Sequence, residues 1–230
     1  MIAIGGDSGT GKAAVAAGLR EIFGAEHCAD VQLDGYFALN RFQRNAVAMS
    51  PHDPRAHDFA AMDEDLVRLS QGETITKPVY DHVMGAIAGS ETIVPRDLVL
   101  VQGRFPLYTQ HLRSLFDVRV WLEREPGLTL PWTIHRDALE RGDGDERVRE
   151  AIARRRADYE KYLTPQARYA DLLVRYTPAG TTYFEDRHEV MPEPSQATRA
   201  DVAPALARTL ALIERRIHAV ADIRLYAVAN

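Results

Sequence analysis

The segment that most constrains this chain is Gly-Asp-Ser-Gly-Thr-Gly-Lys at residues 6–12, which follows an apolar run at residues 1–4 and opens a segment of helical period at residues 12–23. Its three glycines let the backbone curl until successive N–H groups face one concavity, and its lysine adds a cation at the rim. The helix that follows turns its positive dipole end toward the same place. A strand, such a loop and a helix in this order predict a loop that binds the β and γ phosphates of a nucleotide.

Composition narrows the class of protein. A chain of 230 residues, 46% of them hydrophobic, has enough apolar side chains for one large α/β domain. With 27% charged residues and a formal net charge of -5, it resembles neither a disordered chain nor a general nucleic-acid binder. Cys28 is the single cysteine, which excludes an intrachain disulfide and suits a reducing compartment. Because no apolar run reaches about 18 residues and residues 1–4 lack a basic flank, we expect a soluble, cytoplasmic protein without membrane contact.

Apolar runs bounded by turn residues alternate with segments of helical period. The runs lie at residues 1–4, 30–33, 98–102, 118–122 and 170–175. The helical segments lie at residues 12–23, 62–70, 106–114, 128–141 and 145–162. Short buried runs alternating with helices are typical of a mainly parallel sheet covered on both faces. With the phosphate loop, this pattern predicts an α/β fold of the P-loop NTPase type, a three-layer sandwich whose arginine-bearing helix at 128–141 acts as a lid.

Three other segments stand apart from this alternation. A polar loop contains Pro51 and Pro54, and a small hairpin beside the main sheet is expected between Pro78 and Pro95. We expect one domain over residues 1–190, followed at 191–230 by a linker and an amphipathic helix at 202–217. That helix must bury its apolar face either on the core or on a second copy of the chain, so a homodimer remains open.

Seven later segments match, in order, the blocks of one known family. They are Val-Gln-Leu-Asp-Gly-Tyr at 31–36, with Arg41 and Arg44 after it, Pro-His-Asp-Pro-Arg-Ala-His-Asp-Phe at 51–59, Lys-Pro-Val-Tyr-Asp-His at 77–82 with Gly85, Gln-Gly-Arg-Phe-Pro-Leu-Tyr at 102–108, Trp-Thr-Ile-His-Arg-Asp at 132–137, Glu-Arg-Gly at 140–142, and Pro-Gln-Ala-Arg-Tyr-Ala-Asp at 165–171. From Met1 to Thr177 the chain resembles the phosphoribulokinases. The uridine kinases share the fold and match the later blocks less well.

The resemblance implies a kinase that moves the γ-phosphoryl group of ATP, with Mg²⁺, to a hydroxyl of a sugar phosphate, nucleoside or related polyol. Its partners are then ATP and a small acceptor, with no nucleic acid. Carried onto this chain, the catalytic residues are Lys12, Asp34, Arg136 and Asp137. The nucleotide site comprises Gly6, Asp7, Ser8, Gly9, Thr10, Gly11, Lys12, Ala13 and Arg141. The acceptor site comprises Asp34, Tyr36, Arg41, Arg44, Tyr80, His82, Gln102, Arg104 and Arg136.

The chemistry of these residues agrees with that role. Phosphoryl transfer needs alignment and charge neutralisation more than covalent chemistry. Asp34 follows the second apolar run, where α/β sheets place ligand groups, and can accept the proton of the attacking hydroxyl, although an aspartate before glycine is also a common turn former. Arg136 and Arg141 can close over the transferring phosphate as a lid, which Arg155 extends. A cluster of arginines suits the anion of a phosphorylated sugar.

Departures from the family blocks concentrate at this same site. Ala13 stands where a serine or threonine hydroxyl normally binds Mg²⁺, Phe37 where the family has histidine, Thr133 where it has lysine, and Gln102 where it has glutamate. All four changes remove charge or metal-binding capacity. They weaken the case for ribulose 5-phosphate as the acceptor, and they keep open a rival hypothesis, a degenerate kinase that binds nucleotide but regulates or scaffolds.

Two other site classes are not favoured. A dinucleotide-dependent oxidoreductase needs Gly-x-Gly-x-x-Gly, which the loop does not have. The histidines, including His52 and His57, show no spacing typical of a metal triad, so we predict no metal ligand among the protein side chains.

Overall fold

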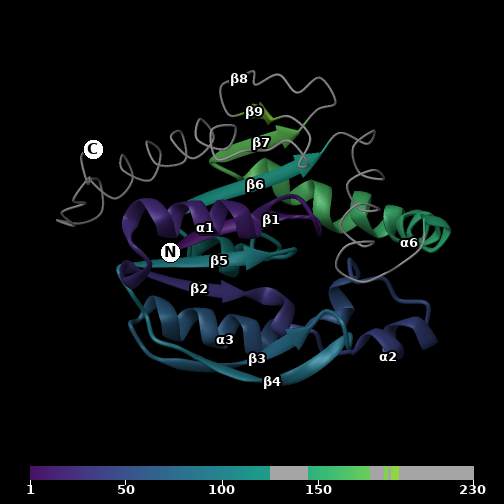
Figure 1. The fold of residues 1–230 in the computed structure, drawn as a ribbon, viewed down its shortest axis with the longest axis horizontal. Helices are drawn as coiled ribbons and strands as arrows, with labels where there is room; N and C mark the ends of the chain where they lie inside the picture. Colours follow the sequence, from purple (N-terminus) through teal and green to yellow (C-terminus); the bar gives the residue numbers. More distant parts are fainter. Residues whose placement is uncertain (125–144, 177–183, 186–187, 192–230) are drawn as a thin grey trace.

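A computed structural model describes residues 1–124, 145–176, 184–185 and 188–191 (Figure 1). Its centre is a seven-stranded sheet in the order β2-β5-β1-β6-β7-β9-β8. The strands are β1 (Ile2–Gly6), β2 (Cys28–Gln32), β5 (Leu98–Gly103), β6 (Val118–Arg124), β7 (Leu172–Tyr176), β8 (Phe184–Glu185) and β9 (His188–Met191). All neighbours are parallel except β8 and β9. The predicted mainly parallel sheet is confirmed, and β8 and β9 extend it beyond the five predicted runs.

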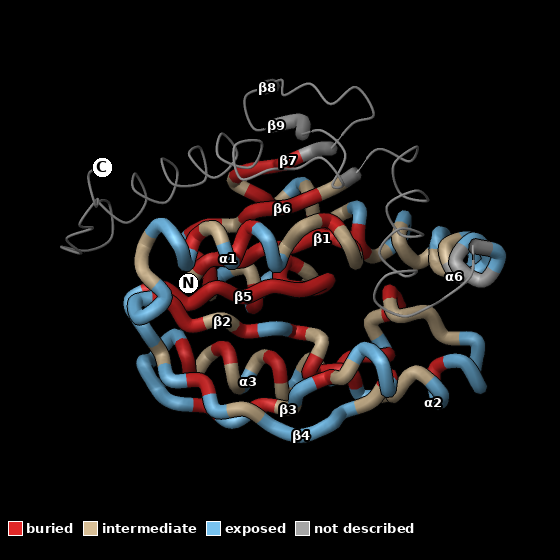
Figure 2. Tube along the Cα trace, in the orientation of Figure 1, coloured by how far each residue is buried: buried red, intermediate tan, exposed pale blue. Residues whose placement is uncertain are grey.

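The central strands are buried on both faces. Ile2 and Ile4 of β1 share a core with α1 (Lys12–Phe23), whereas Ala3 between them faces a second core with α3 (Phe59–Ser70). The same alternation runs along β5, which is buried at every position (Figure 2). A strand between two helical layers needs an apolar residue at each step, and this is why the runs in the sequence are uninterrupted.

The helices follow their predicted segments with shifted ends. α1 has its predicted bounds and buries Val15, Ala16 and Leu19. α3 begins at Phe59 rather than residue 62, because the Asp58 side chain caps it by accepting from the amide of Ala61 at 3.0 Å. The predicted helix at 106–114 is shortened to α4 (Gln110–Ser114), whose N-cap is Thr109.

Other helical predictions are changed or lie outside the described residues. The predicted helix at 145–162 is α6 (Asp145–Asp158), after which a turn of π-helix covers Tyr159–Leu163. A short helix that the sequence analysis missed, α2 (Arg41–Ala46), begins with a capping box between Asn40 and Gln43. The predicted helices at 128–141 and 202–217 lie outside the described residues, so the division of the chain near residue 190 stays a prediction. Among the described helices, none combines the length and apolarity needed to cross a bilayer.

The expected hairpin exists as a separate antiparallel pair, β3 (Ile75–Asp81) and β4 (Ala86–Ile93). The hairpin begins at Ile75, earlier than predicted, so Pro78 lies inside β3 rather than before it. The register of the pair shifts between Pro78 and Tyr80, an irregularity at which a residue without an N–H is tolerated. His82 follows β3 directly, so the hairpin determines where this imidazole lies.

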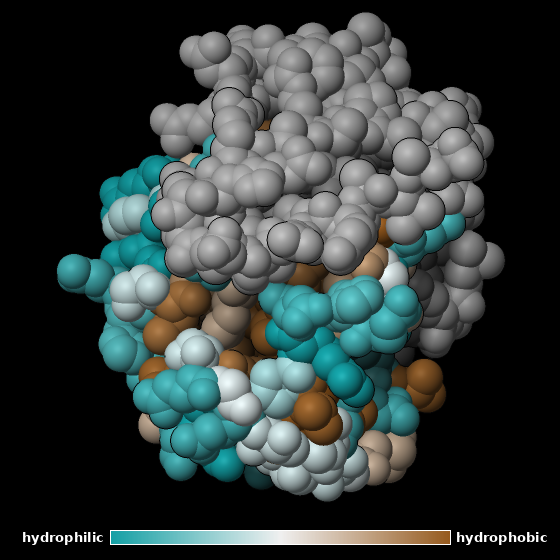
Figure 3. All heavy atoms as spheres, turned by 90° about the vertical axis from the view of Figure 1, so that its left-hand side faces the viewer, coloured by the Kyte–Doolittle hydropathy of each residue, from teal (hydrophilic) through white to brown (hydrophobic). Residues whose placement is uncertain are grey.

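The parallel strands of the main sheet end on one side of the molecule. In Figure 1 their arrows point to the right, where the loop after β1, α2 and α6 gather. Ligands of open parallel sheets bind at the carboxyl ends of the strands. Figure 3 shows the opposite side, where hydrophilic and hydrophobic residues of the described part are mixed in small groups.

Candidate functional site

The loop between β1 and α1 is tightly curled. Gly6, Gly9 and Gly11 have φ of 148°, 78° and 85°, and at Gly6 an added Cβ would lie 2.4 Å from the carbonyl oxygen of Leu122. The amide and hydroxyl of Thr10 both donate to the carbonyl of Asp7, at 3.3 and 2.8 Å. The glycines of the motif are therefore required by the loop's backbone and by its contact with β6.

Lys12 folds back over this loop. Its Nζ donates to the carbonyls of Gly6 at 3.0 Å and Asp7 at 2.7 Å, which places its charge at the concave side where α1 begins. Backbone amides, a helix N-terminus and one lysine form the kind of cradle that binds phosphate groups. The curled geometry predicted for residues 6–12 is thus present.

The residues around the loop restrict how Mg²⁺ can be held. Ala13 lies exposed in the first turn of α1 and offers no oxygen. Within the described ranges, no group of three or more histidine, cysteine or acidic side chains is arranged to hold a metal ion. Mg²⁺ commonly keeps several waters and is bound by substrate phosphates with one or two carboxylates, so nucleotide and water fit this site better than a protein cage.

Asp34 lies just beyond the carboxyl end of β2, in a 3₁₀ turn (Leu33–Tyr36). Its Oδ1 accepts from Arg104 Nη1 at 2.6 Å, and its Oδ2 lies 3.4 Å from His82 Nε2. Burial acts to raise the pKa of Asp34, but Arg104, His82 and Lys12 together outweigh it and hold this pKa below its usual value. Asp34 is therefore an ionised carboxylate at neutral pH, and a weak base that is well suited to orienting a hydroxyl.

Arg44 and Tyr80 are hydrogen-bonded to each other, and both pack on the ring of Phe37. Arg44 is 5% exposed, donates to Leu39 O and to Tyr80 Oη, and places its guanidinium 4.0 Å from the centre of the Phe37 ring. The Arg104 guanidinium lies 5.6 Å from the same ring. Arg44 therefore has internal partners for its guanidinium, and its contact with an acceptor stays a prediction.

Three other predicted acceptor residues are also held by the protein. Tyr36 is buried and donates its hydroxyl to Asp65 of α3 at 2.8 Å. Arg41 donates to the carbonyl of His82 and so fixes the end of β3 against α2. Gln102 donates to both carboxylate oxygens of Asp30, at 2.8 and 3.0 Å.

The Asp30 contact gives a physical reason for Gln102. Burial raises the pKa of Asp30, while the hydrogen bond from Gln102 opposes this rise. A glutamate at position 102 would bring a second carboxylate to the same place, where two like charges destabilise each other. The amide of Gln102 is therefore matched to Asp30 on β2, and its contact with an acceptor stays a prediction.

Two arginine nitrogens near the carboxyl ends of the strands lack a hydrogen-bond partner among the described residues. They are Nε of Arg104 and Nη2 of Arg155, and both are buried. Buried donors of this kind call for an explanation, and an anionic ligand supplies one. The predicted residues Arg136, Asp137 and Arg141 lie outside the described residues.

Sequence reasoning missed two histidines that the structure places next to the site. His57 packs against Phe37 and Phe105, with ring centres 4.4 and 4.8 Å apart, and His52 contacts Asp7 of the phosphate loop. Both lie in the polar segment that the sequence predicts to be a loop. No spacing in the sequence indicates these contacts, since they depend on how residues 50–58 fold across the strand ends.

Comparisons with known proteins agree with this geometry. The family model described as "Phosphoribulokinase / Uridine kinase family" matches residues 1–183. Phosphoribulokinase of Synechocystis sp. is 35% identical over 81% of this chain and 56% of its own length, and uridine kinase of Bacillus pumilus is 30% identical over 76% and 85%. The solved phosphoribulokinase from Rhodobacter spheroides has a TM-score of 0.68 at 17% identity, covering 95% of this chain and 97% of that one.

This chain spans about half the length of the curated phosphoribulokinases that it matches. The matched region nevertheless holds the phosphate loop, Asp34 and the hairpin that carries His82. The chain belongs to the phosphoribulokinase / uridine kinase family.

Proposed function

We propose that this chain is an ATP-dependent kinase that transfers the γ-phosphoryl group to a hydroxyl of a small polyol. The observation that carries the proposal is geometric: the phosphate loop follows β1 and Asp34 follows β2, and both strands run parallel to β5, which lies between them. Lys12 is one of the cations that lower the pKa of Asp34, although the two residues follow different strands. A phosphate held by the loop and a hydroxyl oriented by Asp34 would therefore meet in one site.

In this mechanism the chain mainly aligns groups and neutralises charge. Amides of the loop and Lys12 hold the nucleotide phosphates, with Mg²⁺ supplying further neutralisation through phosphate oxygens and water. Asp34 accepts the hydrogen bond of the attacking hydroxyl, while Arg104 keeps its carboxylate ionised and fixed. In a loose transition state the hydroxyl needs orientation more than a strong base, so a lowered pKa is compatible with this role.

The acceptor is a sugar phosphate, a nucleoside or a related polyol, recognised differently from ribulose 5-phosphate. Phe37 stands where the family block has histidine, and Arg104, which follows β5, is the arginine that contacts Asp34. The positive charge beside Asp34 thus comes from the end of β5 instead of from residue 37. The unpartnered Nε of Arg104 supports an acceptor that brings an oxygen to this position.

The test is acceptor-dependent release of ADP. Purified protein with Mg-ATP and a panel of pentose phosphates and nucleosides is expected to form ADP in proportion to one acceptor. Asp34→Asn should keep ATP binding and lower kcat by roughly 10²–10⁴-fold. Asp97→Asn, which changes an exposed carboxylate paired with His27, is the matched control and should keep the wild-type rate. Full activity of Asp34→Asn would remove Asp34 from the mechanism.

A second function, nucleotide-dependent regulation without transfer, is favoured by two observations. Ala13 lacks a metal-binding hydroxyl, and the carboxylate of Asp34 is already paired with Arg104. ATP binding measured by calorimetry, together with no ADP release for any acceptor, would favour this reading over the kinase.

A further inference from the structure

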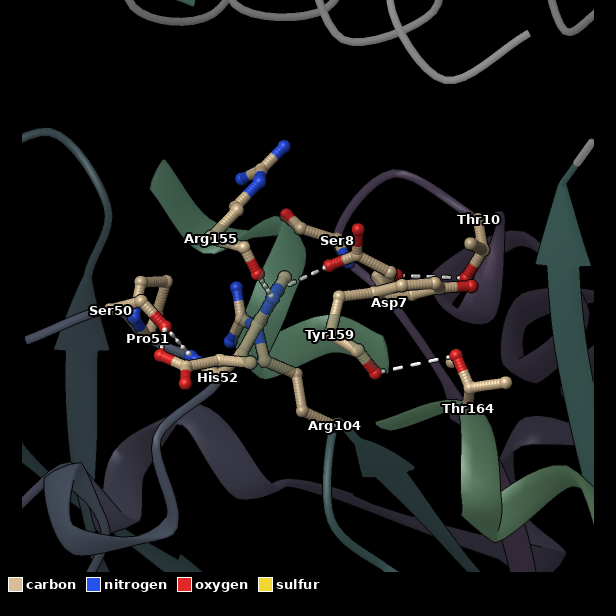
Figure 4. A network of polar contacts seen from close by, with 12 residues as sticks. Asp7, Ser8, Thr10, Ser50, Pro51, His52, Arg104, Arg155, Tyr159 and Thr164 are labelled. Atoms are coloured by element: carbon tan, nitrogen blue, oxygen red, sulfur yellow. Dashed lines mark hydrogen bonds and ion pairs between the residues drawn. The ribbon is translucent and has the colours of Figure 1, made fainter. Parts of the chain in front are cut away.

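Residues 50–52 bridge the phosphate loop and the carboxyl end of α6 (Figure 4). His52 Nε2 lies 2.8 Å from Asp7 Oδ1, and His52 Nδ1 lies 3.4 Å from the carbonyl oxygen of Arg155. Ser50 donates its hydroxyl to Asp158 at 2.7 Å and accepts from the amide of His52 at 3.1 Å. One short segment therefore contacts both the loop after β1 and a helix more than a hundred residues later in the chain.

Asp7 is the residue through which this bridge reaches the phosphate loop. Its side-chain Oδ1 accepts from His52 and from the amide of Ser8, the latter at 2.6 Å. Its carbonyl accepts from Thr10 and from Lys12 Nζ. A shift of Asp7 would therefore move the residues that set the curl of the loop and the position of its lysine.

The His52 contact is buried and directional. Side-chain exposure is 1% for His52 and 7% for Asp7, so water does not compete for this hydrogen bond. The carboxylate and the carbonyl that face the ring are both acceptors, so Nε2–H donates to Asp7 in the shorter contact. Removing one partner of a buried charged hydrogen bond leaves the other with its full desolvation penalty. The pair is built to hold Asp7 in one place.

We propose that His52 is a positioning residue for the nucleotide site: through Asp7 it holds the phosphate loop in its binding conformation, while Ser50 joins the same segment to α6. The inference about ligand affinity rests on the proposed nucleotide binding, whereas the inference about loop order does not. His52 touches no reacting group, and the segment 50–52 acts by fixing the geometry of residues 7–12.

Two measurements on the full chain test this inference. His52→Leu keeps an apolar side chain of similar size and removes the donor, and His52→Gln supplies an amide Nε2 in its place. Without nucleotide, we expect amide hydrogen exchange of residues 7–12 to quicken in His52→Leu and to return toward wild type in His52→Gln. By calorimetry, the Kd for ATP should rise about ten-fold or more in His52→Leu and recover largely in His52→Gln.

The controls separate positioning from general loss of stability. His27→Leu removes a histidine that is hydrogen-bonded to Asp97 at 2.7 Å and lies in the 3₁₀ turn before β2, and it should leave both readouts unchanged. All measurements are made well below the melting temperature of each variant. If His52→Leu does not fold, His52→Asn, whose amide is too short to reach Asp7, replaces it.

Unchanged exchange at residues 7–12 in His52→Leu would overturn the positioning role. The positioning role would also be overturned if exchange quickened, and affinity for ATP fell, as much in His52→Gln as in His52→Leu. The hydrogen-bond donor at position 52 would then be irrelevant. Quickened exchange with rescue, in a protein that binds no ATP even as wild type, would support the positioning of the loop while contradicting the proposed function.

Discussion

His57 is an imidazole enclosed by aromatic rings beside the site. It packs against Phe37 and Phe105, and its Nε2 lies 3.0 Å from the carbonyl of Pro51. Burial lowers the pKa of His57 to about 4, with Arg104 and Arg44 adding to the effect and the Pro51 hydrogen bond opposing it. The folded protein therefore holds this ring neutral at a pH where an unfolded chain protonates it.

This difference in protonation predicts a loss of stability in mild acid. Between pH 6.5 and about 4 the unfolded state binds a proton at His57 that the folded state does not, so the free energy of unfolding falls as pH falls through this window. The slope from this one group approaches about 1.4 kcal/mol per pH unit. Urea unfolding of wild type and His57→Gln at pH 6.5 and 5.5 measures it, and the variant should show the smaller decrease.

Ala17→Ser serves as the control for His57→Gln, because it changes an exposed residue of α1 without adding or removing a titratable group. Its dependence on pH should equal that of wild type. A decrease in His57→Gln as steep as that of wild type would mean that the ring of His57 is protonated in the folded protein.

At the scale of single residues, the sequence predicts positions more reliably than partners. Asp34 is found because it follows an apolar run and lies at a strand end. Arg44 has the charge expected of a phosphate ligand, yet the fold buries it over Phe37. Whether Arg44 faces a ligand or internal partners depends on the contacts between α2 and the β3–β4 hairpin. The local sequence does not predict these contacts.

At the scale of elements, the first turn of α1 offers a direct test of metal binding. Ala13 is exposed there, so a serine hydroxyl fits without displacing a neighbour. We expect Ala13→Ser to lower the Mg²⁺ concentration for half-maximal rate by about ten-fold, since one added oxygen ligand replaces a water. A titration of rate against Mg²⁺ measures this, with Ala17→Ser later on the same helix as control.

An unchanged Mg²⁺ titration in Ala13→Ser would show that the metal is already held by nucleotide, water and carboxylate. It would also remove Ala13 as evidence for a degenerate kinase. If the protein shows no measurable transfer, the Kd for ATP is measured at the same Mg²⁺ concentrations in place of the rate.

The strands of the main sheet were largely predictable, because a strand buried on both faces appears in the sequence as an uninterrupted run of apolar residues. Every predicted run that lies in the described residues became a strand, and α1 kept its bounds. Two errors lie at helix ends that side-chain caps determine, since Asp58 makes α3 begin earlier and Thr109 makes α4 begin later than predicted. A third is the short helix α2, which was not predicted. β8 has two residues and β9 four, too short for a run to stand out from turns.

At the scale of the whole molecule, the sheet order brings distant segments together. β1 lies between β5 and β6, so the phosphate loop, Arg104 at the end of β5 and the turn after β2 occur at neighbouring strand ends. The parallel arrangement predicts this convergence from sequence alone. The β3–β4 hairpin and residues 50–58 complete the site from outside the sheet. Their placement depends on tertiary packing, which the hydrophobic pattern of the sequence does not indicate.

A ligand that binds across these segments should stabilise the entire domain. At an ATP concentration about one hundred times its Kd, binding to the folded state alone adds about 2.7 kcal/mol to the free energy of unfolding. For a chain of this size, that corresponds to a rise in melting temperature of roughly 5–10 °C. Lys12→Ala should lose most of the rise, because it removes the cation of the phosphate loop. Lys161→Ala changes an exposed lysine after α6 and should keep it. Thermal unfolding followed by circular dichroism measures all three proteins, and a wild-type melting curve that ATP leaves unchanged would contradict nucleotide binding at this loop.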